Sequence, residues 1–567
     1  MIVGVKGQTC PSLSKNSAGL LKSTATLGDP QLLKEALFAV ATLFLDPANS
    51  AVPNTAPELA ALSSYHSCGP SWAKSATKEA MSSMATEPSL AACQVLEAVQ
   101  IYWFGVGNPN TGDLCIALAY RFCSVAGYKH DLSSDSTDIA LLLDSELQRR
   151  CFWACWTSVC FAGGPMPYVT AAWTEAAMVP LPARIITSVS GWSIQRAQSM
   201  DENWSPVLLD LQQDGESLAN AAAVLMKLVG VWAKVESFTR THLHSLSSSS
   251  VDEMLAISEL AKRIHTNSAT TSYRLALSKA NDAADLRFLE ISDALYHLGQ
   301  MTLHSKAVPF FSGRSTRPPI PSEVTRSSAK TMLQHADSYV QILQPYLDNM
   351  QDATVLCPLE GFGAFIAAGV LLAAEGSPRR QNMHENFDGD QEKRLYMLKS
   401  LICLVETLQR FWKALQAPYE KLCAAIKASP HHHFLLPESA TNHPASSRMP
   451  NSTDPEACDS GQRRPFPGET SSSRDPNLSD HYQPSQNMGL NCHGMAQISS
   501  QSSDVQALGK RDQVLERSGP VIEANQLFHL DMSDEDWWNL PLADEGGEFP
   551  GLEWFDVFNG SSSSFLA

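Results

Sequence analysis

Residues 90–104 read Leu-Ala-Ala-Cys-Gln-Val-Leu-Glu-Ala-Val-Gln-Ile-Tyr-Trp-Phe, and this stretch decides the predicted fold class. Gln94, Glu97 and Gln100 recur every three residues, and bulky apolar residues fall between them. This spacing predicts an amphipathic α-helix whose three polar side chains face solvent. The residues predicted to face the core are Ala92, Val95, Leu96, Val99, Tyr102 and Trp103.

Helical patterns continue along the chain. After a turn over 105–112, Thr111 is predicted to cap a second helix that stops at Gly127. The core face predicted for this second helix comprises Leu114, Ala117, Leu118, Phe122 and Val125. Further helical patterns cover about 144–161, 205–245, 252–305, 325–350, 357–375 and 391–427. No stretch shows the β-branched alternation typical of a sheet, so the predicted fold class is all-α and multi-helical.

Composition divides the 567 residues into four parts. Residues 1–30 are rich in Ser, Thr and Gly without periodicity, and are predicted to be a disordered N-terminal segment. Residues 31–429 form the predicted helical domain. Residues 430–525 are dense in Ser, Pro, Asn, Asp and Gln, and they hold too few aliphatic side chains to offset the entropy of ordering. We predict a disordered linker there, followed by a distinct segment over 526–567.

The segment 526–567 alternates acidic and aromatic residues. Between Phe528 and Gly560 there are nine Asp or Glu residues and no Lys or Arg. Repulsion between the carboxylates keeps the aromatic side chains accessible, a pattern typical of disordered activation segments that fold on binding. The side chains predicted to anchor this segment in a partner's groove are Trp537, Trp538, Trp554, Phe555 and Phe558.

Charge and hydropathy restrict the partners and the compartment. The formal net charge of −18 repels phosphates, so the chain lacks the basic footprint of a DNA-binding module. No signal-peptide pattern opens the sequence, and the longest apolar run, 361–374, is shorter than the ~20 residues that span a bilayer. We expect a soluble, intracellular protein with no membrane partner.

Cysteine and histidine spacing predicts no metal site and no cofactor. No two cysteines have C-x-x-C spacing, and Cys151, Cys155 and Cys160 on one helix cannot form a tetrahedral cage by themselves. Buried thiols in a reducing compartment are the expected state of the helical cysteines. His242, His244 and 431–433 are interpreted as solvated loop residues, and His297 and His304 as packing or capping residues.

Catalytic motifs are also missing from the sequence. Gly107 and Gly112 have the spacing of a phosphate-binding loop, but Asp113 stands where the lysine is required. Gly105 and Gly107 begin a dinucleotide fingerprint that Asn110 breaks. Since no serine-hydrolase or zinc-protease signature occurs, we predict that the chain is not an enzyme.

Three segments occur in a characteristic order. The first is Tyr102-Trp103-Phe104-Gly105, and the second runs from Leu118-Ala119-Tyr120-Arg121 to Gly127-Tyr128-Lys129-His130. The third is Glu146-Leu147-Gln148-Arg149-Arg150-Cys151-Phe152-Trp153-Ala154. This order resembles the regulatory middle homology domain of fungal zinc-cluster (Zn2Cys6) transcription factors, and a further similar segment covers 296–312. The resemblance spans about 31–428 and implies a helical regulatory domain whose motif core is Arg149, Arg150 and Trp153.

The chain departs from that family in two respects. Val159 stands near the place of a usual acidic residue, and only Cys10 precedes Cys68, so the six-cysteine zinc cluster is missing. The resemblance implies a nuclear transcription regulator that activates a metabolic or secondary-metabolite gene set. Its tail would recruit transcription machinery or a coactivator, and it would reach DNA indirectly or through a missing N-terminal module. The alternative is a co-regulator or inhibitor that sequesters a related full-length zinc-cluster factor.

Overall fold

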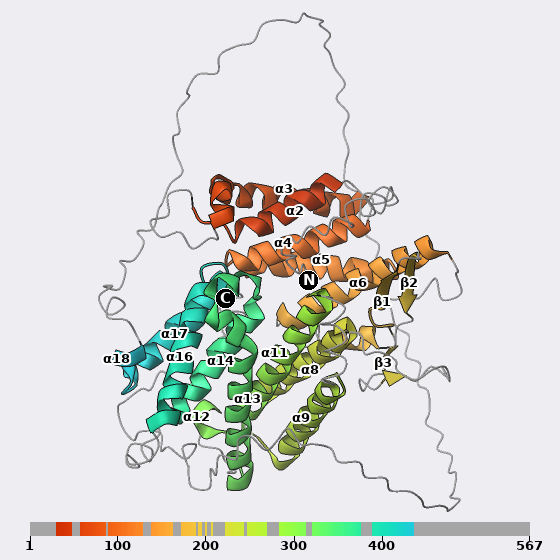
Figure 1. Cartoon of the computed structure of the whole chain (residues 1–567). Helices are drawn as coiled ribbons and strands as arrows, with labels where there is room; N and C mark the ends of the chain where they lie inside the picture. Colours follow the sequence, from red (N-terminus) through yellow and green to blue (C-terminus); the bar gives the residue numbers. More distant parts are fainter. Residues whose placement is uncertain are drawn as a thin grey trace, which may run out of the picture. The chain divides into compact units, whose positions relative to one another are not determined.

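The computed structural model describes most of the chain between residues 30 and 435. The described ranges are 30–47, 57–86, 89–128, 138–162, 172–177, 179–188, 191–195, 199–200, 206–207, 221–242, 246–268, 283–312, 320–375 and 388–435. The linker and the acidic tail with its five aromatic anchors lie outside these ranges, as do Cys10, Lys129 and His130. Helices dominate the described part of the chain, which confirms the all-α class (Figure 1).

The first group of helices comes from the N-terminal half of the chain. It consists of α2 (Pro30–Thr42), η1 (Pro57–Cys68), α3 (Gly69–Thr86), α4 (Leu90–Gly105), α5 (Pro109–Val125) and α6 (Ile139–Ala162). α4 contacts α2, α3, α5 and α6, so it lies at the centre of this group (Figure 1).

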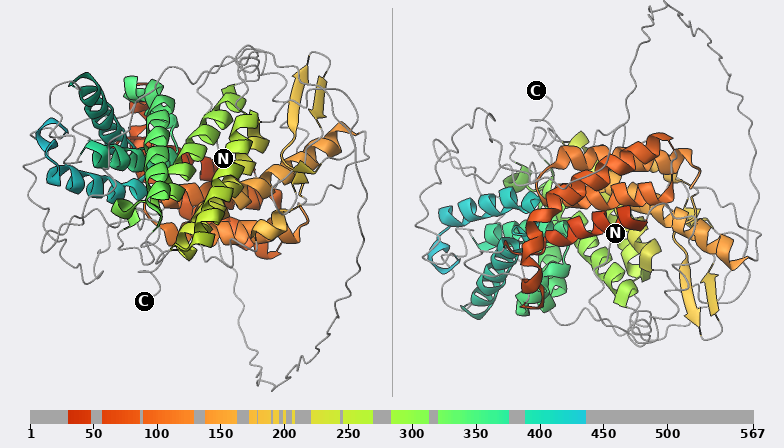
Figure 2. Two further views of the ribbon diagram at one scale, coloured as in Figure 1. Left: turned by 90° about the horizontal axis from the view of Figure 1, so that it is seen from below. Right: turned by 90° about the horizontal axis from the view of Figure 1, so that it is seen from above.

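The second group follows in the chain and packs mainly in sequence order. It consists of α8 (Ala221–Thr241), α9 (Ser248–Ser268), α11 (Ala283–Ser305), α12 (Pro309–Ser312), α13 (Ser322–Asp348), η2 (Met350–Val355), α14 (Pro358–Glu375), α16 (Asp388–Leu408), η3 (Lys413–Leu415), α17 (Gln416–Ala428) and α18 (His432–Leu435). α11 contacts α8, α9, α13 and α14, while α14 contacts α16 and α17. Figure 2 shows these helices side by side from two further directions.

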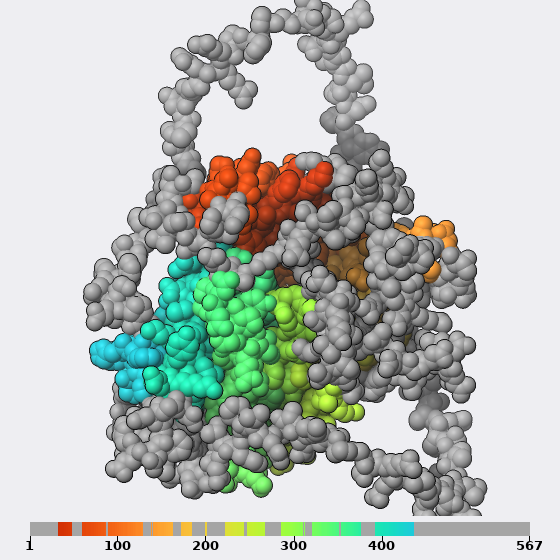
Figure 3. Space-filling view, in the orientation of Figure 1, coloured from red at the N-terminus to blue at the C-terminus, as the bar shows by residue number. Residues whose placement is uncertain are grey.

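The two groups meet through aromatic and helical contacts. The ring of Phe44, just after α2, lies 5.6 Å from that of Phe411 and 5.5 Å from that of Trp412. α6 packs on α8, where the Thr157 hydroxyl lies 3.4 Å from the sulfur of Met226. Figure 3 shows the two groups as adjoining surfaces, red to orange and green to cyan.

α14 is the most deeply buried helix of the second group. Every residue from Glu360 to Glu375 is buried. It is also the one helix in the described ranges that is long and apolar enough to cross a membrane, yet 89% of that window is buried inside the protein. A side chain at Gly363 would collide with the hydroxyl of Tyr339, which donates a hydrogen bond to the Glu360 carbonyl oxygen at 3.0 Å. Glycine therefore allows α13 and α14 to approach closely.

Two predicted helix faces are wrong. Glu97 and Gln100 are buried at 8% and 6% exposure, because α4 is surrounded by other helices and has no solvent side at these positions. On α5, Leu114 and Val125 of the predicted core face are 52% and 70% exposed. The face that packs inward instead carries three small residues, Cys115, Ala119 and Cys123, together with Ile116 and Tyr120. Small residues let α5 approach α4 closely. The prediction was wrong because it chose the buried face by the size of its apolar side chains.

The helix boundaries also need corrections. Asn108, and not Thr111, caps α5, since its side chain accepts a hydrogen bond from the Thr111 amide at 3.3 Å. α6 begins five residues earlier than predicted, at Ile139. The pattern over 252–305 corresponds to α9 and α11, with 269–282 outside the described ranges.

Short strands occur where none was predicted. β1 (Arg184–Ser188) pairs antiparallel with β2 (Gly191–Gln195), and β3 (Ser199–Met200) pairs with β4 (Pro206–Val207). β4 also contradicts the start of the helix predicted over 205–245. β1 does contain three consecutive β-branched residues, Ile185 to Thr187, but a run of three is too short to predict a strand by alternation.

Brief proteolysis of the purified full chain is expected to leave a resistant core that ends close to residue 430. The packed helices continue through α18, His432–Leu435, which overlaps the first residues of the predicted linker. Composition predicts that the rest of the linker, 436–525, stays unfolded and open to proteases. Mass spectrometry of the resistant fragments gives the boundary. Recovery of an intact fragment running through 430–520 would contradict both the boundary and the predicted linker.

Candidate metal centre

Four cysteine side chains from three helices meet inside the first group. Cys93 lies on α4, Cys123 on α5, and Cys151 and Cys155 on α6. All four are buried free thiols, and their sulfur atoms lie within 4.8 Å of one another. The Sγ of Cys123 is 3.9 Å from those of Cys151 and Cys155, and the Sγ of Cys93 is 3.9 Å from that of Cys155. The pair Cys93–Cys123 is closer, at 3.1 Å.

Local sequence explains how each helix presents its thiol. Ser89 caps α4 by accepting a hydrogen bond from the Ala92 amide at 3.2 Å, which fixes the turn that carries Cys93. On α5, Ala119 lies one turn before Cys123, and its carbonyl oxygen accepts a hydrogen bond from the Cys93 thiol at 3.3 Å. Cys151 and Cys155 are four residues apart on α6 and therefore share one face.

The four thiols do not ionise equally. Hydrogen bonds from Cys123, Cys155 and Cys93 hold the pKa of Cys151 well below its ordinary value. Hydrogen bonding with Cys123 and Cys151 raises the pKa of Cys93 and of Cys155 well above theirs. Cys151 is therefore the most acidic of these thiols, and a thiolate is the form that binds metal.

A buried polar group adjoins the cysteines. Glu97, one turn after Cys93 on α4, accepts hydrogen bonds from the Ser158 hydroxyl at 2.5 Å and the Gln100 amide at 3.4 Å. Its Oε2 is buried without a hydrogen-bond partner. Burial raises the pKa of the Glu97 carboxyl, while hydrogen bonds from Ser158 and Cys155 oppose that shift. Burial thus favours the neutral form of this carboxyl, which interacts with Cys155.

The predicted motif core is a structural brace on α6. Glu146 is 1% exposed and accepts hydrogen bonds from Arg149 at 2.7 Å, from Arg150 at 2.8 Å and from the Ala183 amide at 2.9 Å. Arg150 also donates to the Ala183 carbonyl oxygen at 2.8 Å. The Trp153 indole donates to the Pro180 carbonyl oxygen at 2.8 Å. The motif therefore fixes segment 180–183 against α6, and the Glu146 carboxylate is the shared acceptor of its hydrogen bonds.

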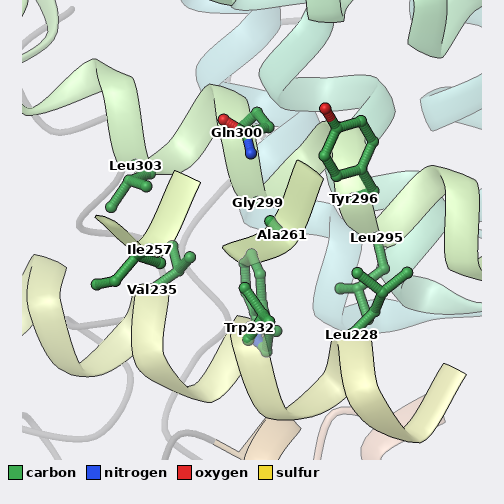
Figure 4. A pocket seen from close by; sticks show the side chains of 11 residues that line it. Leu228, Trp232, Val235, Ile257, Ala261, Leu295, Tyr296, Gly299, Gln300 and Leu303 are labelled. Atoms are coloured by element: carbon green, nitrogen blue, oxygen red, sulfur yellow. The ribbon is translucent and has the colours of Figure 1, made fainter. Parts of the chain in front are cut away.

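A small apolar pocket lies between α8, α9 and α11 (Figure 4). Trp232, Ile257 and Leu295 contribute to its walls, and no carboxylate, histidine, cysteine or lysine lines it. Both ends of the Gln300 amide are engaged by Ser258, which donates to its oxygen at 2.7 Å and accepts from its nitrogen at 3.1 Å. The pocket therefore offers mainly packing contacts, and Tyr296 is the one titratable side chain that lines it.

None of the described histidines belongs to the group of four cysteines. His297 Nδ1 is 2.7 Å from His335 Nδ1, and His304 hydrogen-bonds the hydroxyls of Ser328 and Ser258. These partners agree with the interpretation of His304 as a packing or capping residue. His242 was expected to be a solvated loop residue, but it is part-buried just after α8, 3.2 Å from the Ser250 hydroxyl and 3.4 Å from the Glu253 carboxylate. His432 and His433 lie in the short helix α18, and His244 is outside the described ranges.

The sequence argument missed Cys93 and Cys123 because it compared only cysteines that are close along the chain. The separation between Cys93 and Cys123 is 30 residues, far from any familiar metal-ligand spacing. Cys151 and Cys155, four apart on a predicted helix, were the available signal, since that spacing can supply two ligands from one face. Cys115 and Cys160 are buried on the same helices but do not belong to the centre.

Comparison with known proteins adds no assignment to this centre. No known protein family matches the chain, and no curated protein or solved structure is significantly similar to it.

Proposed function

We propose that this chain is a transcription regulator of the fungal type, in which a helical regulatory domain over 31–429 carries an acidic activation segment over 526–567. The observation that carries the proposal is the placement of the family-like segments. They fall on α4, α5 and α6, three consecutive helices that pack against each other. Their polar residues, Glu146, Arg149 and Arg150, serve this packing and do not face a pocket.

A non-enzymatic role is part of this proposal. Within the described ranges, the buried ionic side chains brace helices, as Glu146 does on α6 and Arg394 does with Glu375. The apolar pocket between α8, α9 and α11 holds no nucleophile–base pair. This arrangement suits a domain that docks or senses through its surface.

The proposed partners follow from charge. A chain of net charge −18 is suited to protein partners, so we assign the tail to transcription machinery or a coactivator and DNA contact to an associated zinc-cluster factor. Such a regulator works in the nucleus, and we propose a metabolic or secondary-metabolite gene set as its target.

The test is a reporter experiment with residues 526–567 fused to an unrelated DNA-binding domain. We expect the fusion to activate the reporter gene. Replacing Trp537, Trp538, Trp554 and Phe555 with alanine should abolish most of that activity, since each buried aromatic side chain contributes about 1–3 kcal/mol to binding. Neutralising any two carboxylates should reduce activity only modestly, because those charges mainly steer the encounter.

The same experiment distinguishes the alternative function. If the aromatic side chains instead fold onto the helical domain, the fusion will be inert and deletion of 526–567 will lower the thermal stability of the remaining chain. That pair of results would replace the activator with a co-regulator that sequesters a related full-length factor.

A further inference from the structure

We propose that Cys93, Cys123, Cys151 and Cys155 bind one zinc ion that ties α4, α5 and α6 together. The inference goes beyond the proposed function and does not depend on it. It reverses the expectation from sequence that the helical cysteines only pack. The site also differs from the six-cysteine cluster of the family, since its ligands come from three separated helices of the regulatory domain.

The sulfur positions match a tetrahedral zinc site. With Zn–S bonds of ~2.3 Å, the sulfurs at the corners of a tetrahedron lie ~3.8 Å apart. Three of the six sulfur pairs are separated by 3.9 Å, and the pair Cys93–Cys123, at 3.1 Å, must widen to bind zinc. The remaining two pairs lie within 4.8 Å. Because all four sulfurs lie within 4.8 Å of one another, the centre accommodates a single ion and not a multi-iron cluster.

The burial of the four cysteines indicates a structural metal site and not a catalytic one. All four cysteines are buried, which leaves no open coordination position for water or substrate. A closed site of four thiolates is typical of structural zinc. Its binding free energy adds directly to the stability of the fold, because the ligands are scattered over 63 positions of the unfolded chain, from Cys93 to Cys155.

The charge balance requires support from neighbouring groups. Four thiols lose four protons when Zn²⁺ binds, and the resulting centre carries a net charge of −2. Glu97 has a buried carboxyl oxygen without a partner and interacts with Cys155. In its protonated form it can donate a hydrogen bond to a thiolate sulfur, the outer support that buried metal–thiolate sites need.

Metal analysis of the full chain, purified from zinc-supplemented cells under reducing conditions, tests the proposal. We expect about one zinc ion per chain, and removal of zinc with a strong chelator should lower Tm by ~5 °C or more. Cobalt(II) added to the metal-free chain should give a thiolate-to-cobalt charge-transfer band and the intense visible bands of tetrahedral cobalt. The cobalt experiment uses the unmodified chain, so its result does not depend on whether a cysteine variant folds.

Matched alanine variants separate metal binding from packing. Cys151→Ala removes a ligand, whereas Cys160→Ala removes an equally buried thiol from the same helix outside the centre. Against a competing chelator, Cys151→Ala should lower zinc retention on the order of ten-fold or more, and Cys160→Ala should retain zinc as the unmodified chain does.

Three results would overturn the proposal. The first is zinc far below one ion per chain together with no cobalt charge-transfer band. The second is stoichiometric iron or copper in place of zinc. The third is a Cys93–Cys123 disulfide, found by mass spectrometry of the alkylated chain, since that bond would consume two of the four ligands.

Discussion

Replacing Arg287 with alanine is expected to lower the free energy of unfolding by about 3–5 kcal/mol, because it leaves the buried carboxylate of Glu360 without its cation. Glu360 is 0% exposed at the start of α14, and Arg287 reaches it from α11. The Glu360 Oε2 also accepts a hydrogen bond from the Cys357 amide at 2.9 Å. Chemical denaturation of the full chain, followed by circular dichroism, measures the loss.

The interaction couples two helices far apart in sequence. Arg287 also donates to the Val355 carbonyl oxygen at 3.2 Å and to the Glu290 carboxylate at 3.2 Å. The pKa of the Arg287 guanidinium is set by two opposing effects, desolvation, which lowers it, and the Glu360 charge, which raises it and prevails. The pair therefore holds α11 against the N-terminal turn of α14.

A double variant and a surface control make this prediction specific. Adding Glu360→Gln to Arg287→Ala should recover at least ~1 kcal/mol, because the remaining partner no longer carries a buried charge. Arg410→Ala, which breaks the exposed pair with Glu406 at 3.8 Å, should change stability by less than ~0.5 kcal/mol. A loss below ~1 kcal/mol for Arg287→Ala would show that Glu360 does not need its partner.

Acidification from pH 6.5 to 4.5 is expected to destabilise the folded chain by several kcal/mol through three buried histidines. Burial lowers the pKa of His297 to about 2, of His335 to about 3 and of His304 to about 4. The unfolded value is ~6.5. Below that pH the unfolded chain binds protons that the folded chain cannot, so stability present above pH 6.5 is lost as the pH falls. Each histidine contributes about 1–2 kcal/mol over this window.

The geometry of the histidine pair strengthens the effect. His297 and His335 face each other at 2.7 Å between their Nδ1 atoms, so one ring must donate and the other must accept. The His265 ring lies 5.7 Å from that of His297 and hydrogen-bonds Asp293 at 3.0 Å. A second proton on the pair would place two cations in contact within the core, which is unfavourable.

Denaturation curves at several pH values measure this dependence. His335→Gln should flatten the slope of stability against pH below 6.5, whatever its effect on stability at pH 7. His66→Asn, at an exposed position, should leave the slope unchanged. An unmodified chain whose stability stays constant between pH 6.5 and 4.5 would contradict the burial of these rings.

Helix positions were largely accessible from sequence because periodicity is a local property. The patterns over 325–350 and 357–375 correspond to α13, Ser322–Asp348, and α14, Pro358–Glu375. Both are long segments in which apolar residues repeat with the helical period, so their ends were misplaced by a few residues at most. The β1–β2 hairpin was missed since a five-residue strand gives too short a pattern to compete.

The sequence by itself determined the all-α class, the place of most helices, the acidic-aromatic composition of the tail and the burial of the cysteines on α4, α5 and α6. Only the tertiary structure decided which faces are buried. α4 and α5 are apolar on more than one side, and the helices that pack against them determine which side is buried. It also showed Glu146 to be the hub of the motif that holds Arg149 and Arg150. The four-thiol centre belongs to this second kind of information, since it arises where three helices, separated in sequence, pack close enough for their sulfurs to meet.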